Sequence, residues 1–175
     1  MNRIDTDRLE LHAFEPSLIV ALHEIFIDPD VRHFLLDEAI VDRGWVEREI
    51  AQSQERVAAG GLGLWAARER GGSRWIGFTG YREFYQPPQL QLVVALLPEA
   101  WHRGFATEMA RAVIDHAWRS TRLTEIRASI DEPNVASWRM LERLGFTRIG
   151  SSPGDHGWVQ VHFAIPRGAH TDPNR

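Results

Sequence analysis

The segment from Leu90 to Arg119 constrains the fold of this chain more than any other part of the sequence. The run Leu90–Leu97 is almost entirely apolar and stops at Pro98. A run of this length and composition is typical of a strand that is covered on both faces, and we predict a central strand here. From Arg103 to Arg119 apolar residues recur at helical spacing, which predicts a long amphipathic helix. A buried strand that leads directly into such a helix indicates a mixed α and β fold.

The rest of the chain alternates between strand and helix patterns. Strands are predicted over residues 8–14, 62–68, 74–83, 125–131, 147–150 and 158–165, and helices over residues 17–26, 42–59 and 134–144. Together with the segment above, this makes about seven strands and about four helices in an α/β (α+β) fold. A chain of 175 residues fits one domain. We predict a single domain over residues 1–175, with a core at about 5–165 and a polar tail at 166–175.

The composition excludes several classes of protein. No cysteine is present, which excludes disulfides, thiolate metal sites and a cysteine nucleophile. The eight histidines form no H-E-x-x-H motif and no close cluster, so we predict no metal site. The net charge is −4 and the basic residues are scattered, which argues against a nucleic-acid partner. No segment approaches the ~20 apolar residues that cross a membrane, and the start of the chain lacks an apolar signal core, so we expect a cytoplasmic protein with no membrane partner.

The junction between the apolar strand and the long helix carries the strongest chemical signal. It is built from Arg103, Gly104 and Ala106, and its small residues allow the backbone to approach a ligand closely. The first N–H groups of a helix lack partners within the helix and, together with the helix dipole, form a site for an anion. Arg103 adds positive charge and Thr107 adds a hydroxyl. A diphosphate would fit here, although an ordinary loop that enters a helix explains the same residues.

The sequence around this junction resembles the GNAT superfamily of N-acetyltransferases. Members of that superfamily carry a Q/R-x-x-G-x-G/A loop between the fourth strand and the following helix, and this chain has Trp-His-Arg-Gly-Phe-Ala at residues 101–106. Trp101 stands where Gln or Arg is usual. That departure resembles the RimJ/RimL-type branch, whose pattern is W-x-x-G-aromatic-A-T-E, and the residues through Glu108 match it.

Three further segments resemble the same branch, in the same order along the chain. They are the opening strand at residues 6–11, the third strand at residues 75–80, and the block at residues 134–146 that ends in Leu-Gly-Phe. Each motif is short and unspecific. The ordered set, from about residue 5 to residue 165, is specific.

The resemblance implies both a fold and a co-substrate. A GNAT-like domain has a mixed, mostly antiparallel sheet in which two central parallel strands splay apart, here residues 90–97 and 125–131. Acetyl-CoA would lie with its pantetheine arm between these strands, where a main-chain N–H stabilises the oxyanion, and with its diphosphate on the loop. The residues that would bind it are Val94, Ala95, Leu96, Leu97, His102, Arg103, Gly104, Phe105, Ala106, Thr107, Asn134 and Ser137.

Asn134 and Ser137 lie three residues apart at a predicted helix start and therefore share a face. Their spacing fits a helix cap, because Asn is a favoured N-cap residue. The resemblance adds a second role, in which Asn134 contacts the pantetheine arm and Ser137 lies near the sulfur. Many GNAT enzymes protonate the leaving thiolate with a Tyr seven residues after the Asn, but here that position is Leu141. Ser137, or a water that it holds, is our candidate donor.

A general base is the least determined part of the site. The attacking amine must be neutral, and an α-amino group with a pKa of about 7.7–8.0 needs less help than a lysine-like amine. Glu83 at the end of the third strand is our candidate base, directly or through water. Asp131, Glu132, His102 and His156 are the other candidates, and a solvated surface charge explains each of these residues as well.

Three functions are compatible with this sequence. The first is transfer of an acetyl group from acetyl-CoA to a primary amine, on a small molecule or a protein N-terminus, in a ternary complex. The second is a non-catalytic acyl-CoA-binding sensor or interaction module, and the third is an unrelated α+β binding domain. The acceptor wall is expected from loops at residues 26–36, 84–89 and 152–158, where Phe34, Tyr85 and Trp158 would line an apolar mouth. The sequence leaves monomer and homodimer open.

Overall fold

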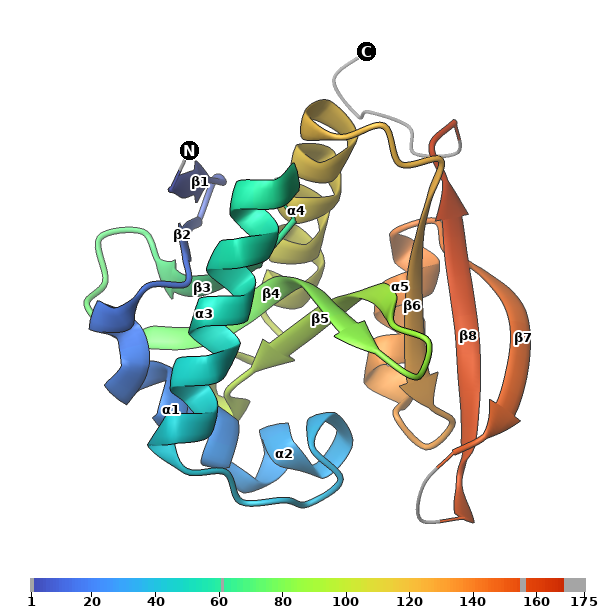
Figure 1. The fold of residues 1–175 in the computed structure, drawn as a ribbon, viewed down its shortest axis with the longest axis horizontal. Coiled ribbons are helices and arrows are strands. Elements are labelled where there is room, and N and C mark those ends of the chain that lie inside the picture. The colour runs from blue at the N-terminus through green and yellow to red at the C-terminus, as the bar shows by residue number, and fades with distance from the viewer. Residues whose placement is uncertain (1, 61, 155–156, 169–175) are drawn as a thin grey trace.

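The computed structural model describes residues 2–60, 62–154 and 157–168. Figure 1 shows a mixed arrangement of helices and strands, as the alternating patterns predict. Within the described residues the elements follow in this order: β1 (Arg3–Asp5), β2 (Leu9–Ala13), η1 (Pro16–Leu18), α1 (Ile19–Ile27), α2 (Pro29–Leu35), α3 (Arg43–Gly60), β3 (Leu64–Glu69), β4 (Trp75–Phe84), β5 (Gln89–Leu96), η2 (Pro98–Ala100), α4 (Phe105–Ser120), β6 (Glu125–Asp131), α5 (Val135–Arg143), β7 (Thr147–Pro153) and β8 (Val159–Pro166).

The strands form two sheets rather than the single sheet that we expected. One sheet has the order β1-β2-β3-β4-β5 and the other has the order β6-β8-β7 (Figure 1). Neighbouring strands within both sheets run antiparallel. The prediction of a central strand at residues 90–97 is wrong in one respect, because β5 is the last strand of its sheet. Its counterpart β6 belongs to the other sheet, so the parallel direction of the splayed pair stays a prediction.

Side chains of the first sheet alternate between two apolar layers, as a strand period of two requires. Trp65 and Ala67 of β3 face the cluster that contains α4, whereas Leu64 and Ala66 face the cluster that contains α1 and α3. β5 is divided in the same way, which explains its nearly continuous apolar sequence. The expectation that this strand is covered on both faces is therefore confirmed.

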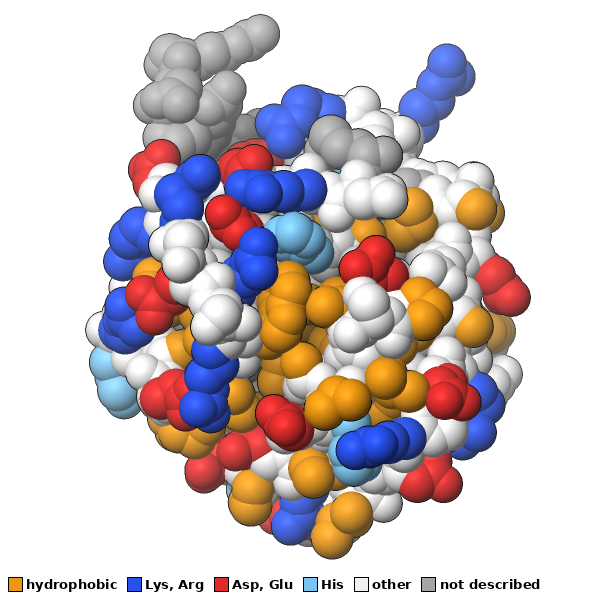
Figure 2. Space-filling model, turned by 90° about the vertical axis from the view of Figure 1, so that its left-hand side faces the viewer, with side chains coloured by type: hydrophobic (Ala, Val, Ile, Leu, Met, Phe, Trp, Pro, Cys, Tyr) orange, Lys and Arg blue, Asp and Glu red, His pale blue; other side chains and the backbone are white. Residues whose placement is uncertain are grey.

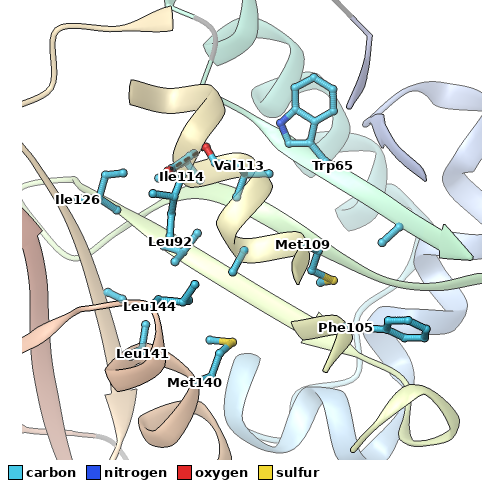
Figure 3. Packing of buried hydrophobic residues seen from close by; sticks show 14 of the residues in the cluster. Trp65, Leu92, Phe105, Met109, Val113, Ile114, Ile126, Met140, Leu141 and Leu144 are labelled. Atoms are coloured by element: carbon cyan, nitrogen blue, oxygen red, sulfur yellow. Dashed lines mark hydrogen bonds between the residues drawn. The ribbon is translucent and has the colours of Figure 1, made fainter. Parts of the chain in front are cut away.

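The helix α4 supplies the centre of the larger core. Met109, Val113 and Ala117 are fully buried along one face, and Ala110 and Ile114 are fully buried beside them. Figure 3 shows α4 side chains pointing toward Leu92 of β5 and toward Met140, Leu141 and Leu144 from the α5 region. The amphipathic spacing predicted this helix, and its packing fixes the start of α4 against the end of β5.

The segment at residues 26–36 was expected as a loop, and this is wrong. Residues Pro29–Leu35 form α2, and the Asp28 carboxylate accepts hydrogen bonds from the N–H groups of Asp30 and Val31 at 3.0 and 3.2 Å. A capping Asp followed by Pro at the first helical position is a helix start signal as well as a breaker. From the sequence we interpreted Asp28-Pro29 only as the end of the preceding helix, and so did not predict α2.

The outer surface of the N-terminal half carries charges of both signs. Figure 2 shows Arg side chains interspersed with Asp and Glu around a small apolar region on this face. Within the described residues, no helix is both long enough and apolar enough to cross a membrane.

Candidate active site

A cavity of about 1040 Å³ lies where β5 and β6 separate. Its walls come from Leu92–Leu96 of β5, from Ala128–Asp131 of β6, from the N-terminal ends of α4 and α5, and from α2. This volume is typical of a site for a small molecule or cofactor. Because β5 is the last strand of one sheet and β6 is an outer strand of the other, the edges that face the cavity have main-chain groups without strand partners. The cavity therefore combines apolar walls with polar backbone.

The start of α4 presents three main-chain amides at one end of this cavity. Gly104 precedes the helix with a φ of 80°. The N–H of Glu108 donates to the Gly104 carbonyl at 3.1 Å, and this bond closes the first turn. The amides of Phe105, Ala106 and Thr107 precede that bond, and all three residues line the cavity. Their positive ends and the helix dipole suit an anionic ligand.

The Arg103 side chain lies elsewhere than we expected. Its guanidinium forms a bidentate pair with the Glu69 carboxylate, with N–O distances of 2.7 and 2.6 Å, and stacks on the Phe105 ring at 4.4 Å. The hydrogen bond from Arg103 lowers the pKa of Glu69. Arg103 is absent from the cavity wall among the described residues. It therefore braces the loop through Glu69 rather than offering its charge to the cavity.

Two other arginines contribute positive charge to the cavity wall. Arg139 and Arg143 stand four residues apart on α5, so they share one face of that helix. Both line the cavity. We did not predict this role from the sequence, although the spacing of the two arginines within residues 134–146 was a usable signal.

Main-chain groups of β5 divide between its partner strand and its open edge. The Leu97 N–H donates to the Ile76 carbonyl of β4 at 2.8 Å. Because successive residues of an antiparallel strand direct their main-chain groups to alternate sides, those of Ala95 and Leu97 face β4. Those of Val94 and Leu96 face the open edge beside the cavity. Of the four residues that we predicted for cofactor binding here, Leu97 is absent from the described cavity wall.

Trp101 holds this edge in place. Its indole N–H donates to the Leu96 carbonyl at 2.8 Å, while 41% of the residue remains exposed. This bond occupies the Leu96 carbonyl, which lies at the end of the open edge of β5. His102, which follows with a φ of 59°, also lines the cavity.

Asn134 and Ser137 line the cavity together at the start of α5. The Asn134 side-chain oxygen accepts a hydrogen bond from the Ser137 N–H at 3.1 Å, so the helix-cap interpretation is confirmed. Leu141 is buried in the cavity wall, at the position where the family resemblance would imply a Tyr.

The candidate bases are not gathered in one place. Asp131 is buried and lines the cavity, and His102 lines it near the α4 loop. Glu83, our preferred candidate, is exposed and does not line the described cavity, and the same holds for Glu132. His156 lies outside the described residues. Glu83 misses the cavity because its strand β4 is separated from the gap by β5.

An aromatic and polar wall closes the cavity away from α4. Phe34 of α2 and Tyr85 of the β4–β5 turn line it, as expected, while Trp158 stacks on Phe34 at 5.7 Å behind the wall. The Tyr85 hydroxyl donates to the Gln160 side-chain oxygen. Burial raises the pKa of Tyr85, so its phenol stays protonated well above neutral pH. We predicted no role for Gln160 from the sequence, although it alternates with buried residues along β8.

Comparison with known proteins places these features in a family. The Acetyltransferase (GNAT) domain matches residues 8–147. The uncharacterised N-acetyltransferase YoaA of Bacillus subtilis (strain 168) is 25% identical over 152 residues, which cover 84% of this chain and 84% of YoaA.

Two solved structures share the fold. Spermidine N-acetyltransferase from Vibrio cholerae, in complex with CoA and spermine, superposes with a TM-score of 0.77 at 14% identity, covering 94% of this chain and 98% of that chain. The acetyl transferase from Salmonella typhimurium that modifies the N-terminal serine of the 50S ribosomal subunit protein L7/L12 gives a TM-score of 0.74 at 14% identity, with coverage of 94% and 98%.

The fold is a mixed α/β arrangement in which two antiparallel sheets part around a large cavity. The chain belongs to the GNAT acetyltransferase family, and it is an acetyltransferase. The resemblance that its motifs indicated is confirmed.

Proposed function

We propose that this protein transfers an acetyl group from acetyl-CoA to a primary amine. The observation that carries this proposal is the shape of the cavity, which joins the amides at the start of α4 to the open edge of β5. An extended ligand with a diphosphate at one end and a thioester at the other matches that arrangement. The spermidine N-acetyltransferase from Vibrio cholerae, which shares this fold, supports a CoA-based co-substrate, because that protein was solved with CoA.

The diphosphate would bind at the α4 amides of Phe105, Ala106 and Thr107. Arg139 and Arg143 would add charge from the α5 side of the same cavity. The pantetheine arm would then lie along β5 and pair with the main-chain groups of Val94 and with the N–H of Leu96, since the Leu96 carbonyl accepts from Trp101. The thioester would then lie between β5 and β6.

The chemistry is a direct attack of the amine on the thioester. The amine nitrogen forms a bond to the carbonyl carbon, the carbon–sulfur bond breaks, and the thiolate leaves with the electron pair. The nitrogen loses one proton to water as the amide forms, and the thiolate takes up one proton. A main-chain N–H at the β5 edge would stabilise the oxyanion that forms in between. Ser137, which lines the cavity at the start of α5, is the proposed proton donor to the sulfur.

The acceptor class that we propose is a primary amine on a small molecule or a protein N-terminus. The two structural relatives named above act on spermidine and on an N-terminal serine, so both kinds of amine occur on this fold. Asp131 in the cavity wall favours a cationic acceptor over an anionic one.

Calorimetric titration with acetyl-CoA, with coenzyme A as a control, tests the first half of this proposal. We expect micromolar binding of both. Turnover is then measured as thiol release with a panel that contains spermidine, small alkylamines and peptides with free α-amines. Folded protein that binds neither ligand would contradict the proposed site, and binding without turnover on any amine would contradict the proposed reaction.

The substitution Ser137→Ala tests the proton donor. The loss of the hydroxyl should lower kcat about tenfold or more, because general acid catalysis contributes on this scale, while acetyl-CoA affinity changes little. Ser120→Ala is a suitable control, since the Ser120 hydroxyl donates to the His116 carbonyl at the C-terminal end of α4 and Ser120 does not line the described cavity. An unchanged kcat in Ser137→Ala would leave Ser137 with a structural role only.

A further inference from the structure

A chain of hydrogen bonds crosses the second sheet beside the cavity. His162 of β8 lies between β6 and β7, with its Nδ1 2.8 Å from the Ser129 hydroxyl and its Nε2 2.9 Å from the Ser152 hydroxyl. The register places Ser129 directly opposite His162. Three neighbouring strands thus each contribute one member of the chain. Phe163, the next residue of β8, packs edge-to-face against Trp138 of α5, so the hydrogen-bonded side chains lie on the sheet face away from α5.

The hydrogen-bonded side chains of Ser129, His162 and Ser152 border two cavities. Ser129 and Ser152 line both the large cavity and a second one of about 370 Å³, whereas His162 lines only the second. Tyr85 also lines both, and its ring centroid is 6.2 Å from that of His162. The two hydroxyls are therefore polar groups that a ligand in the large cavity can reach, and the imidazole behind them is not.

The three side chains have the donors and acceptors that proton transfer needs. A neutral imidazole has one N–H donor and one nitrogen acceptor, and each hydroxyl both donates and accepts. With the Nδ1–H of His162 donating to Ser129, the Nε2 accepts from Ser152. Imidazole is also the side chain that most often acts in general acid–base catalysis.

We propose that the Ser152–His162–Ser129 chain removes the proton from the acceptor amine. This rests on the proposed acetyltransferase function and extends it. One N–H bond of the ammonium breaks, its proton moves to the Ser152 oxygen, and the Ser152 proton moves to Nε2 of His162. The neutral amine keeps its lone pair for attack on the thioester. The imidazolium then releases its Nδ1 proton through Ser129 to water in the second cavity, which leaves His162 with its proton on Nε2. His162 lines that cavity, and exchange with water there moves the proton from Nε2 back to Nδ1, which restores the starting state.

The charged groups around His162 are compatible with proton transfer from the large cavity toward the second cavity. Asp131 lies in the wall of the large cavity, where it favours the incoming ammonium. Arg127 lines the second cavity, and its charge is offset by Glu125 at 2.6 Å. Tyr85, from the β4–β5 turn, stays neutral because burial raises its pKa.

The test compares two minimal amines that differ mainly in basicity, ethylamine and trifluoroethylamine, at saturating acetyl-CoA. The variant His162→Gln keeps a hydrogen-bonding side chain but cannot take up a proton. We expect its kcat/KM to fall about hundredfold with ethylamine and by less than about threefold with trifluoroethylamine, because the weakly basic amine is already neutral. Ser152→Ala and Ser129→Ala should show the same selective loss, since each interrupts the chain.

His23→Gln is the matched control, because His23 hydrogen-bonds to the Val41 carbonyl far along α1 and should leave both rates unchanged. Equal losses with both amines, or no loss with ethylamine, would overturn the relay while acetyl transfer stands. If the wild-type protein binds acetyl-CoA but acetylates no amine, the proposed function fails and the relay fails with it. The values of kcat/KM are compared only for variants whose melting temperature and acetyl-CoA affinity match those of the wild type. If His162→Gln does not fold, Ser152→Ala is used for the same comparison.

Discussion

Gly104 has a φ of 80°, a backbone conformation that residues other than glycine rarely adopt. It also lines the cavity at the start of α4. We predict that Gly104→Glu abolishes acetyl-CoA binding in calorimetric titration, because it places bulk and negative charge where the diphosphate would lie. Gly71→Glu is the matched control: Gly71 has a φ of 74° with open space around it, so the backbone strain is similar and the cavity is untouched. Retained affinity in folded Gly104→Glu would refute the assignment of this loop.

Arginines near the loop differ in what their side chains contact. The Arg103 guanidinium is held by Glu69, whereas Arg139 and Arg143 line the cavity. We predict that Arg103→Ala weakens acetyl-CoA binding less than about threefold and that the double variant Arg139→Ala/Arg143→Ala weakens it about tenfold or more, since ion pairs with phosphate are worth more than a distant charge. Titrations at one ionic strength measure both. The reverse order would mean that Arg103 leaves Glu69 to bind the ligand.

At the scale of elements, Glu108 ties the start of α4 to the turn between β1 and β2. Its carboxylate accepts from the Arg8 N–H at 3.0 Å and from the Arg8 side chain at 2.7 Å, and also from the Thr6 hydroxyl. Burial would raise the pKa of Glu108, but the hydrogen bonds from Thr6 and Arg8 outweigh it and lower the pKa overall. This contact positions the loop that precedes the helix.

The pH dependence of this contact follows from the sign of the shift. Because the folded pKa lies below the unfolded one of about 4.3, the contribution to stability is present above that value and is lost as the pH falls through the folded pKa. We predict that Glu108→Gln lowers the free energy of unfolding by about 1–3 kcal/mol near neutral pH and that the difference from wild type shrinks in acid. Urea denaturation at several pH values measures this.

Glu125→Gln is the control for that experiment. Glu125 forms an exposed pair with Arg127, so its loss should cost less than about 0.5 kcal/mol at any pH. A Glu108→Gln difference that does not change with pH would contradict the assignment of the shift to this carboxylate.

At the scale of the whole molecule, the cavity lies between two sheets that share no strand pairing in the described residues. A ligand that binds along β5 would therefore act as a bridge between them. At a hundredfold excess over Kd, acetyl-CoA should add about 2.7 kcal/mol of stability, which corresponds to a rise in Tm of about 5–10 °C for a protein of this size.

Amide exchange locates that stabilisation. We predict slower exchange in β5, at Val94 and Leu96, and in the α4 loop when acetyl-CoA is present, and little change in β1 and β2. Protection that spreads evenly over the first sheet, or that omits β5, would contradict binding at the open edge.

Local periodicity predicted most of the fold. The burial of Met109, Val113, Ile114 and Ala117 on one face of α4 is confirmed, and so is the coverage of β5 on both sides. The α2 helix was missed because Asp28-Pro29 signals a helix start as well as a break. The short β1 was missed because its three residues are too few to show a period.

The sequence by itself determined which faces of the helices and strands are apolar, and its ordered motifs identified the family, because such patterns depend on residues only two to four positions apart. Only the tertiary structure decided which distant side chains meet. Arg103 pairs with Glu69 across 34 residues, and His162 meets Ser129 across 33. Glu83 misses the cavity, because β5 lies between β4 and the gap. Such contacts depend on the order of strands and the register between them, and neither is encoded in the spacing of residues along one segment.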